Sequence, residues 1–478
     1  MDSLDAALKA ANTVVWEYLL IYLLIGAGVW FTLRTRFVQF RLFGRICAAA
    51  LGSREGAQGG ISPFQAFAIG LASRVGTGNI AGVAIAITLG GPGAVFWMWC
   101  VALLGMATAF VEATLAQVFK VPQPDGTFRG GPAFYIRDGL GAPAWASVFA
   151  ALLLFTFGLA FNAVQANTIA AVAAETAGVP TWGTAAALVL LAAPVVFGGT
   201  RAVARVAEWM APLMALAYVA MALVIVALNI DRVPEVLGLI LRSAFGLDTA
   251  VAGATGGMMA AVLNGVRRGL FSNEAGMGSA PNAAATATTA HPATQGMLQS
   301  LGVFVDTLVV CSATAFIILV SGVYDPARTG AVEGATLTQA AVAGTFGAAG
   351  MAFMAGAVFL FAFSSILGNY CYADGNLTFL RAPPAAFAGF RVAVLAAVAG
   401  GSVAALPMVW MLADIAMGLM ALVNLGAILL LSRWAVGALE DYEAGTAKGG
   451  SDDAAGAAPR FQAAGNPHLP GELKTQAW

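Results

Sequence analysis

A glycine-interrupted apolar segment constrains this chain more than any other feature. Residues 71–93 read LASRVGTGNIAGVAIAITLGGPG, long enough to cross a membrane but with a polar stretch at residues 73–79. Glycine costs about 1 kcal/mol in a helix interior relative to alanine, so Gly76 and Gly78 favour unwinding. In hydrocarbon, unwound backbone is tolerated only where it lines a protein-walled or watery cavity. The segment therefore predicts a broken membrane helix that binds a small polar solute.

The composition predicts an all-α polytopic membrane protein. Of the 478 residues, 60% are hydrophobic and 10% are charged, and so few charges could not cover a soluble protein of this size. Eleven runs are long enough to cross about 30 Å of hydrocarbon. They lie near residues 14–33, 62–90, 93–118, 147–175, 182–200, 209–230, 250–280, 294–321, 345–371, 388–406 and 408–433.

The runs divide the chain into four parts. Residues 1–61 hold an N-terminal transmembrane helix and an arginine-rich, amphipathic segment that we expect at the cytoplasmic membrane surface. Residues 62–230 and 250–433 each hold five spans. Residues 440–478 are rich in Ala, Gly and Asp without an apolar period, which predicts a disordered cytoplasmic tail.

Positive charges predict the orientation of the spans. Arginine and lysine gather in alternate connections, around residues 34–54, 120–137, 201–205 and 381–391 and from residue 433 onward. The other connections hold only Lys9, Arg232, Arg242 and Arg328. Because cytoplasmic loops carry the excess of positive charge, we expect the N-terminus outside and the C-terminus in the cytoplasm.

A second interruption reads NGVRRGLFSNEAGMGSAPN at residues 264–282, where Gly269, Gly276 and Gly278 can unwind a helix. With the first span set aside, the two breaks fall in the first and sixth of ten spans. Broken helices at matching places in two five-helix halves predict an inverted-repeat transporter with its site at the membrane midplane. The alternative is a cytoplasmic loop between two ordinary helices.

The electrostatics of two broken helices suit a zwitterion. Half-helix N-termini present free N–H groups that attract a carboxylate, and half-helix C-termini present carbonyl oxygens that suit an ammonium group or a sodium ion. An amino acid carries both charges. The sequence therefore predicts an amino-acid carrier.

Several motifs carry a family resemblance. The stretches SRVGTGNIAGVA, GGPGAVFWMW, GMATAFVEATLAQ, RGLFSNEAGMGSAPNAA and FSSILGNYCYAD resemble the alanine or glycine:cation symporters, which are sodium-coupled amino-acid carriers. The similarity runs from about Pro63 to Leu430. It implies a fold like that of the bacterial leucine transporter, with one extra helix before a ten-helix core.

The resemblance implies roles for particular residues. Val75–Asn79 look like the unwound part of the first core helix, and the N–H groups of Thr77 and Gly78 would hold the substrate carboxylate beside Asn79. The carbonyls of Ala72 and Val75 would face a sodium ion. The serine pair Ser364 and Ser365 would complete that sodium site. Without the resemblance, adjacent serines in a helix often bond only to their own backbone.

Other polar residues complete the predicted substrate site. Gln165 lies in an amide cluster with Asn162 and Asn167, which should face the helix bundle. Helical spacing puts Asn162 and Gln165 on one face and turns Asn167 away. The resemblance makes Gln165 a substrate contact, and an interhelical hydrogen bond is its alternative. Asn273, with the backbone around Phe271 to Gly276, is the candidate for the amino end of the substrate.

Three acids lie within apolar spans, namely Glu112, Asp306 and Asp414. Charges there are expensive and usually functional or paired. They could carry protons, but Arg74, Arg267 and Arg268 are available as counter-ions, so we favour structural ion pairs.

These observations predict a sodium-coupled symporter. We expect it to be an integral, multi-pass protein of the plasma (inner) membrane of a bacterium. Alanine or glycine is the favoured substrate. Glutamine is possible, because Asn369 stands where some members of the family have tryptophan. The alternatives are an ion or solute channel and a proton-coupled carrier. An enzyme is not expected, because no paired catalytic constellation is found. We expect no cofactor beyond the coupling ion, no nucleic-acid partner and no obligate protein partner.

Overall fold

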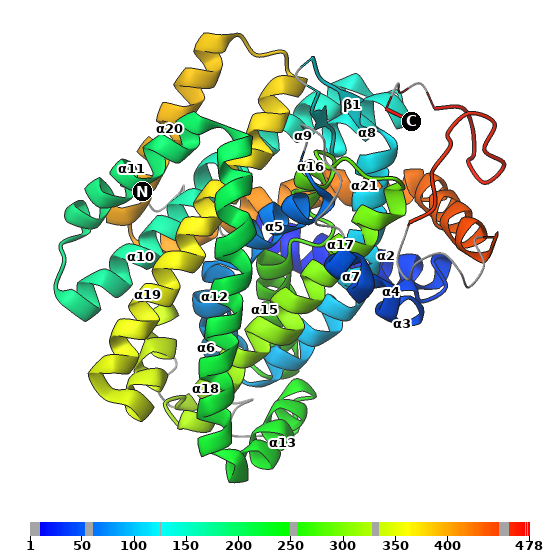
Figure 1. Ribbon diagram of the computed structural model, residues 1–478. Coiled ribbons are helices and arrows are strands. Elements are labelled where there is room, and N and C mark those ends of the chain that lie inside the picture. Colours follow the sequence, from blue (N-terminus) through cyan, green and yellow to red (C-terminus); the bar gives the residue numbers. More distant parts are fainter. Residues whose placement is uncertain are drawn as a thin grey trace.

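Helices form nearly all the regular structure of the chain in a computed structural model, in agreement with the predicted all-α class (Figure 1). The structure describes residues 10–52, 61–124, 126–248, 256–326, 334–448, 458–473, 475 and 477–478. Within them the paired strands are β1 (Val121–Pro122) and β2 (Phe128–Arg129), an antiparallel pair in the loop after α7.

The first half of the chain contains a series of helices, several of them with π-helical turns (η). They are η1 (Val14–Leu20), α2 (Ile21–Arg34), α3 (Val38–Arg41), α4 (Phe43–Gly52), α5 (Pro63–Arg74), η2 (Gly78–Gly82), α6 (Val83–Gly90), α7 (Gly93–Val118), α8 (Pro132–Gly139), α9 (Pro143–Phe155), η3 (Thr156–Ala160), α10 (Phe161–Ala177), α11 (Thr181–Gly198) and α12 (Thr200–Leu228). A capping box begins α5, because Ser62 and Gln65 each bond to the other's backbone N–H.

The second half contains the remaining helices. They are η4 (Ile230–Arg232), α13 (Val233–Ala244), α15 (Gly257–Asn273), α16 (Ala280–Ala284), α17 (Pro292–Val303), η5 (Phe304–Cys311), α18 (Ser312–Ser321), α19 (Gly334–Phe379), α20 (Pro384–Val403) and α21 (Leu406–Lys448). Of these, η4 is a 3-10 turn and η5 is π-helical. Within α19, Gly347 has a positive φ of 58° and joins two helices across a kink.

Nine helices in the described part of the chain are long and apolar enough to cross a membrane. A tenth candidate is the pair α5 and η2–α6, bent by 49° at its break. The remaining predicted span, the seventh in chain order at residues 250–280, contains α15 and ends at the first residue of α16, and residues 250–255 lie outside the described ranges. With 17 residues, α15 falls short of a full crossing by itself.

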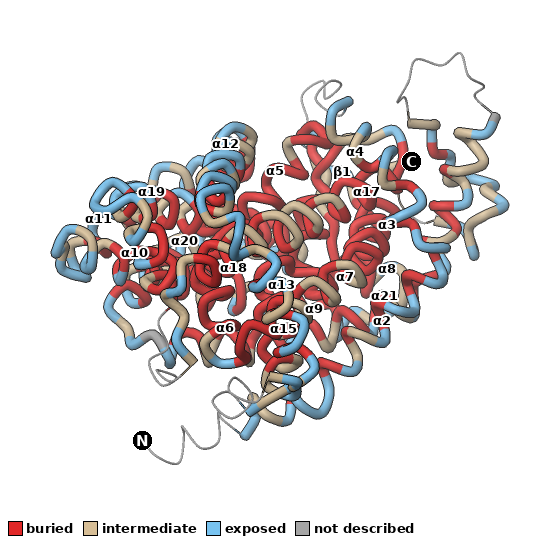
Figure 2. The backbone as a smooth tube through the Cα atoms, turned by 90° about the horizontal axis from the view of Figure 1, so that it is seen from below, coloured by how far each residue is buried: buried red, intermediate tan, exposed pale blue. Residues whose placement is uncertain are grey.

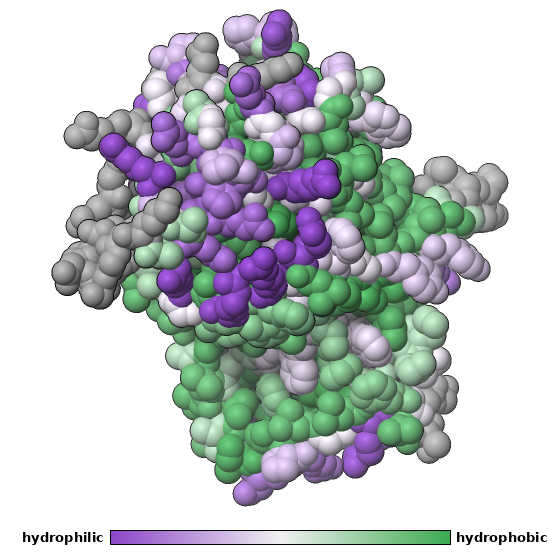
Figure 3. Space-filling model, turned by 90° about the vertical axis from the view of Figure 1, so that its right-hand side faces the viewer, coloured by the Kyte–Doolittle hydropathy of each residue, from purple (hydrophilic) through white to green (hydrophobic). Residues whose placement is uncertain are grey.

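The surface has the apolar belt of a membrane protein. Figure 3 shows a broad hydrophobic region, with hydrophilic residues concentrated above it and a few at its lower edge. On α12, Trp209, Leu213 and Leu216 are exposed, whereas Ala211 and Met214 on the other face are buried. The exposed apolar stripe of this helix is suited to lipid contact.

Small residues allow the helices to pack closely in the buried interior (Figure 2). A side chain at Gly401 would clash with the backbone of Ala163, so α20 touches α10 directly there. A side chain at Gly93 would meet the backbone of Ser243 and Ala244 in the same way. Such close approach supplies the van der Waals contacts that drive helix association in membranes.

The prediction of a disordered tail from Glu440 onward is not met by the described residues. Residues 440–448 continue α21, while residues 449–457 lie outside the described ranges. Farther on, the Phe461 N–H donates to the Ala290 carbonyl (2.9 Å), and Trp478 Nε1 donates to the Gln117 carbonyl (3.0 Å). Lys120 Nζ lies 4.1 Å from the centre of the Trp478 ring. Phe461 and Trp478 are single aromatic residues in a segment without an apolar period, so no sequence pattern predicted these contacts.

His291 links the tail region to the start of α17. Its Nδ1 accepts from the Ala293 N–H (3.1 Å) as the N-cap of that helix, so the ring proton lies on Nε2, which contacts Asp441 (3.1 Å). The rings of Tyr442 and Phe461 each lie 5.1 Å from the His291 ring. Burial lowers the pKa of His291 from its ordinary 6.5 to about 4, although Asp441 opposes the shift. Protonation of Nδ1 would also break the N-cap.

This arrangement predicts acid sensitivity with a defined window. Between about pH 6.5 and pH 4 the unfolded chain binds a proton that the folded chain does not, so stability falls as the pH is lowered through that range. Thermal unfolding of the purified protein at several pH values measures the slope. The variant His291→Asn keeps an N-cap acceptor without titrating. A slope in that variant as steep as in the native chain would contradict the assignment.

Candidate functional site

The first predicted break is present. The helix α5 ends at Arg74, Val75 leaves helical geometry with ψ 87°, and helical structure resumes at Gly78. The break falls within residues 73–79, where the sequence predicts it. The prediction of an interrupted apolar helix at this place is confirmed.

The second predicted break is present as well. Glu274 ends α15 in the left-handed conformation (φ 59°), Gly276 and Gly278 have φ of 86° and 81°, and α16 begins only at Ala280. Gly269 behaves differently from the prediction. It lies inside α15, where a side chain would clash with Val101 of α7, so its role is packing.

The two breaks meet, as the sequence predicts. The Ser73 hydroxyl donates to Glu274 (3.1 Å), and a side chain on Gly78 would lie 3.0–3.1 Å from atoms of Phe271 and Ser272. All five residues are buried. Two crossings that are distant in sequence therefore form one polar centre.

Side chains satisfy the backbone groups that the first break frees. Asn79 Oδ1 accepts from the Gly76 N–H (2.9 Å), and Gln165 Oε1 accepts from the Thr77 N–H (3.1 Å). The Thr77 hydroxyl is buried and has no hydrogen-bond partner among the described residues. Thus Gln165 bonds to one of the N–H groups that the resemblance assigns to a substrate carboxylate.

Three of the four predicted sodium ligands, Ala72, Ser364 and Ser365, lie together. The Ser364 and Ser365 hydroxyls lie 3.0 Å and 3.2 Å from the Ala72 carbonyl oxygen, and Ser365 also donates to the Ser73 carbonyl (2.8 Å). Each serine also reaches the Phe361 carbonyl of its own helix, as the alternative interpretation expected. Val75, the fourth predicted ligand, directly follows α5, and a side chain on the next residue, Gly76, would clash with the Ser365 hydroxyl.

The amide cluster faces the bundle, in agreement with the prediction. Asn162 accepts from Asn369 (2.9 Å), whereas Asn167 points elsewhere and donates to the carbonyls of Gly401 (2.9 Å) and Ala404 (2.7 Å). The Ser73 hydroxyl, whose one proton is shared with Glu274, also lies 2.7 Å from Asn369 Oδ1. The Asn369 amide therefore joins α10 and α19 to the end of α5.

At the second break, side chains again form hydrogen bonds with the freed backbone groups. Glu112 accepts from the Gly276 N–H (3.2 Å), and Asn424 donates to the Gly276 carbonyl (2.9 Å) and to Glu112 (3.0 Å). Asn273 Oδ1 accepts from the Ala275 N–H (3.0 Å). The polar groups that the sequence assigns to the amino end of a substrate are engaged in holding the unwound segment.

Aromatic side chains lie against the broken helices, and sequence patterns did not single them out. The Phe271 ring lies between Phe161 (centroids 4.5 Å apart) and Trp410 (4.6 Å), and Arg268 lies 4.7 Å from the centre of the Trp410 ring. Single aromatic residues in apolar spans carry no sequence signal of their own. Only their convergence identifies them.

The three intramembrane acids differ in their partners. Asp414 pairs with Arg268, and Arg267 lies 3.8 Å away, so the predicted ion pair is confirmed there. For Glu112 and Asp306 no direct ion pair forms among the described residues, where their hydrogen-bond partners are neutral groups, although Arg74 is near enough for its charge to act on both acids. Asp306 accepts from Asn79, Ser272 and Thr307 at 2.7–2.8 Å.

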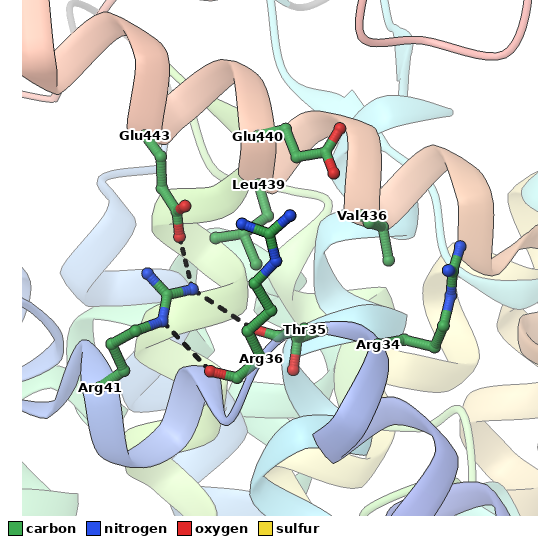
Figure 4. A pocket seen from close by; sticks show the side chains of 8 residues that line it. All are labelled: Arg34, Thr35, Arg36, Arg41, Val436, Leu439, Glu440 and Glu443. Carbon is green, nitrogen blue, oxygen red and sulfur yellow. Dashed lines mark hydrogen bonds and ion pairs between the residues drawn. The ribbon is translucent and has the colours of Figure 1, made fainter.

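A surface pocket lies apart from this centre, between the end of α2 and α21 (Figure 4). It is lined by Arg34, Thr35, Arg36, Arg41, Val436, Leu439, Glu440 and Glu443. Arg41 pairs with Glu443 across it (2.7 Å). The pocket contains none of the predicted site residues. No group of three or more metal-binding side chains is present in the described part of the chain.

Comparison with known proteins agrees with these features. Residues 1–456 match the profile of the sodium:alanine symporter family. The chain is 46% identical to the probable sodium/glutamine symporter GlnT of Bacillus subtilis, over 92% of this chain and 91% of that protein. It is 46% identical to the amino-acid carrier protein AlsT of B. subtilis, over 99% and 97%. It is 36% identical to the sodium/alanine symporter AgcS of Methanococcus maripaludis, over 89% and 94%.

The buried ion pair generates a stability prediction. The side chains of Arg268 and Asp414 are 4% and 5% exposed, so Asp414→Asn leaves a buried guanidinium without its counter-charge. We expect a loss of about 3–5 kcal/mol, read as a lower midpoint of thermal unfolding in detergent. The control is Asp138→Asn at the half-exposed pair with Arg137, where about 1 kcal/mol or less is expected. Equal losses in the two variants would contradict the prediction.

Proposed function

Because the chain belongs to the sodium:alanine symporter family, we propose that it is a sodium-coupled symporter that imports a small neutral amino acid. The observation that carries the proposal is the meeting of two interrupted helices beside a serine pair. The Ser73–Glu274 bond joins the breaks, and Ser364 and Ser365 face the Ala72 carbonyl. A transporter family and apolar spans place the protein in a membrane.

In the proposed site the substrate carboxylate binds the N–H groups of Thr77 and Gly78, with the free Thr77 hydroxyl as a further donor. This requires the Gln165 amide to leave the Thr77 N–H and to turn toward the ligand. The Gln165 oxygen thus satisfies that donor when no carboxylate is bound. The rings of Phe161 and Phe271 would cover the apolar part of the substrate.

Sodium would occupy the group of neutral oxygens at the end of α5. The carbonyls of Ala72 and Val75 and the hydroxyls of Ser364 and Ser365 are hard oxygen ligands, and such ligands suit a small hard cation. Asn79, Asn273 and Gly276 would hold the unwound segments in shape around the substrate.

The two breaks support an inverted-repeat architecture. In this proposal residues 62–230 and 250–433 are the two five-helix repeats, α15 and α16 together form the broken sixth core span, and the complete protein has eleven crossings. The positive charges support an external N-terminus and a cytoplasmic C-terminus. Sodium and substrate order the same unwound segments, so each raises the affinity for the other, and this coupling is reciprocal.

The names of the relatives support a class of substrate, small neutral amino acids, and do not select one member of it. Their names include both alanine and glutamine. Because Asn369 is engaged by Asn162 and Ser73, its small side chain leaves room near the site without offering a free amide. Alanine or glycine remains the favoured substrate, and glutamine the alternative.

Uptake by the purified protein in proteoliposomes tests the proposal. An inward sodium gradient should drive saturable accumulation of labelled alanine, with a panel of both enantiomers, glycine and glutamine as competitors. Accumulation driven by a proton gradient without sodium would instead support a proton-coupled carrier. Flux that neither saturates nor runs against a gradient would support a channel.

The serine pair gives a sharper test. Ser364→Ala with Ser365→Ala should raise the sodium concentration for half-maximal uptake by roughly tenfold or more, because two hydroxyl ligands are lost. Ser402→Ala is the matched control, since Ser402 donates only to the Val398 carbonyl of its own helix (2.9 Å). The same sodium dependence in the double variant and in the native chain would overturn the sodium assignment.

A further inference from the structure

Arg74 is a buried cation with an unused binding edge. It is 2% exposed at the end of α5, and its Nη1 donates to the Gln299 carbonyl (3.2 Å). Its Nε and Nη2 have no hydrogen-bond partner among the described residues, and no acid there lies within ion-pair distance. A guanidinium stays charged, and Nε with Nη2 forms the fork that binds a carboxylate through two parallel hydrogen bonds.

The buried acids around Arg74 do not fill this fork. Glu274 accepts from the hydroxyls of Ser73 and Ser279 (3.1 Å and 2.6 Å). Glu112 and Asp306 are engaged by the neutral donors described above. An unpaired buried charge is costly. These three acids act on the charge of Arg74 from a distance without bonding to it, so Nε and Nη2 stay open to a further carboxylate.

The first break separates Arg74, the last residue of α5, from Gly78. The fork therefore belongs to the α5 side of the break. Helical side chains lean toward the helix N-terminus, and both Arg74 Nη1 and Phe67, two turns earlier in α5, face Gly302. The N-terminal end of α5 contacts the start of α17, where Gln295 donates to the Pro63 carbonyl (2.9 Å). In the proposed topology this is the cytoplasmic end.

Further unpartnered polar atoms lead from Arg74 toward that end. They are Gln299 Oε1, Ser300 Oγ and Thr294 Oγ1 on α17 and Thr114 Oγ1 on α7, all buried and without partners among the described residues. Thr114 faces Gly296, one turn before Ser300. Buried polar atoms are nearly always paired, so these four atoms on two facing helices are free to bond water or a solute that reaches them.

We propose that Arg74 is a second carboxylate-binding residue, which receives the α-carboxylate of the transported amino acid after it leaves Thr77 and Gly78. This polar path, formed by Gln299, Ser300, Thr294 and Thr114, then leads the substrate to the cytoplasm. The inference rests on the proposed function. It adds a binding step between the central site and release.

The test separates binding from release. In Arg74→Lys and Arg74→Gln, the maximal rates of sodium-driven alanine uptake and of alanine efflux should fall by roughly tenfold, the loss expected when hydrogen bonds to a charged group are removed. Sodium-dependent binding of labelled alanine to the purified protein should change less than about threefold. Arg129→Lys is the control, because Arg129 already pairs with Asp374 (3.2 Å) and the rate should stay within about twofold.

Other outcomes overturn the inference. Transport at the native rate in both Arg74 variants would overturn it. So would a folded variant in which alanine binding falls as much as transport does. A chloride requirement that disappears with Arg74→Gln would assign the fork to a free anion instead. If the Arg74 variants do not fold, Thr114→Val with Ser300→Ala should still slow efflux about threefold or more with binding intact, and unchanged efflux there refutes the polar path. Absent sodium-driven uptake in the native chain refutes the proposed function itself, whatever the variants do.

Discussion

Backbone that leaves the helical pattern inside a membrane must find its hydrogen bonds within the protein, and the centre of this structure is built on that constraint. Five of the freed groups have side-chain partners. The pairs are Asn79 with the Gly76 N–H, Gln165 with the Thr77 N–H, Asn273 with the Ala275 N–H, Glu112 with the Gly276 N–H and Asn424 with the Gly276 carbonyl. These partners come from helices on several sides, so the breaks persist only because the rest of the bundle surrounds them.

The same constraint explains how the polar centre can be both stable and exchangeable. Gln165 satisfies the Thr77 N–H with a neutral oxygen, and in the proposed site a ligand carboxylate would replace it with a stronger, charged acceptor. The serine hydroxyls at the end of α5 are similar, because each has a carbonyl within reach on its own helix and another on the broken one. A serine that gives up one of these carbonyls therefore has another within reach.

Charge is distributed unevenly around this centre. On one side, Arg268 and Asp414 neutralise each other beside the Trp410 ring. On the other, Arg74 keeps a free fork while Glu112, Glu274 and Asp306 are held by neutral donors. The ion pair leaves no open bonding edge between its partners, whereas the Arg74 fork is open to a further acceptor, as the proposed release step requires.

The sequence by itself determined the membrane class, most of the spans and the two breaks, because hydropathy and glycine placement act locally. It also grouped Ala72 with Ser364 and Ser365 through resemblance. Only the tertiary structure decided which groups meet. Thr77 and Gln165 are 88 residues apart, and Arg268 and Asp414 are 146 apart, so no local pattern could tell that Asp414 is ion-paired while Asp306 is not. Likewise, the tail docks through isolated residues such as Phe461, whose apolar contacts exist only once the surface they bury against has formed.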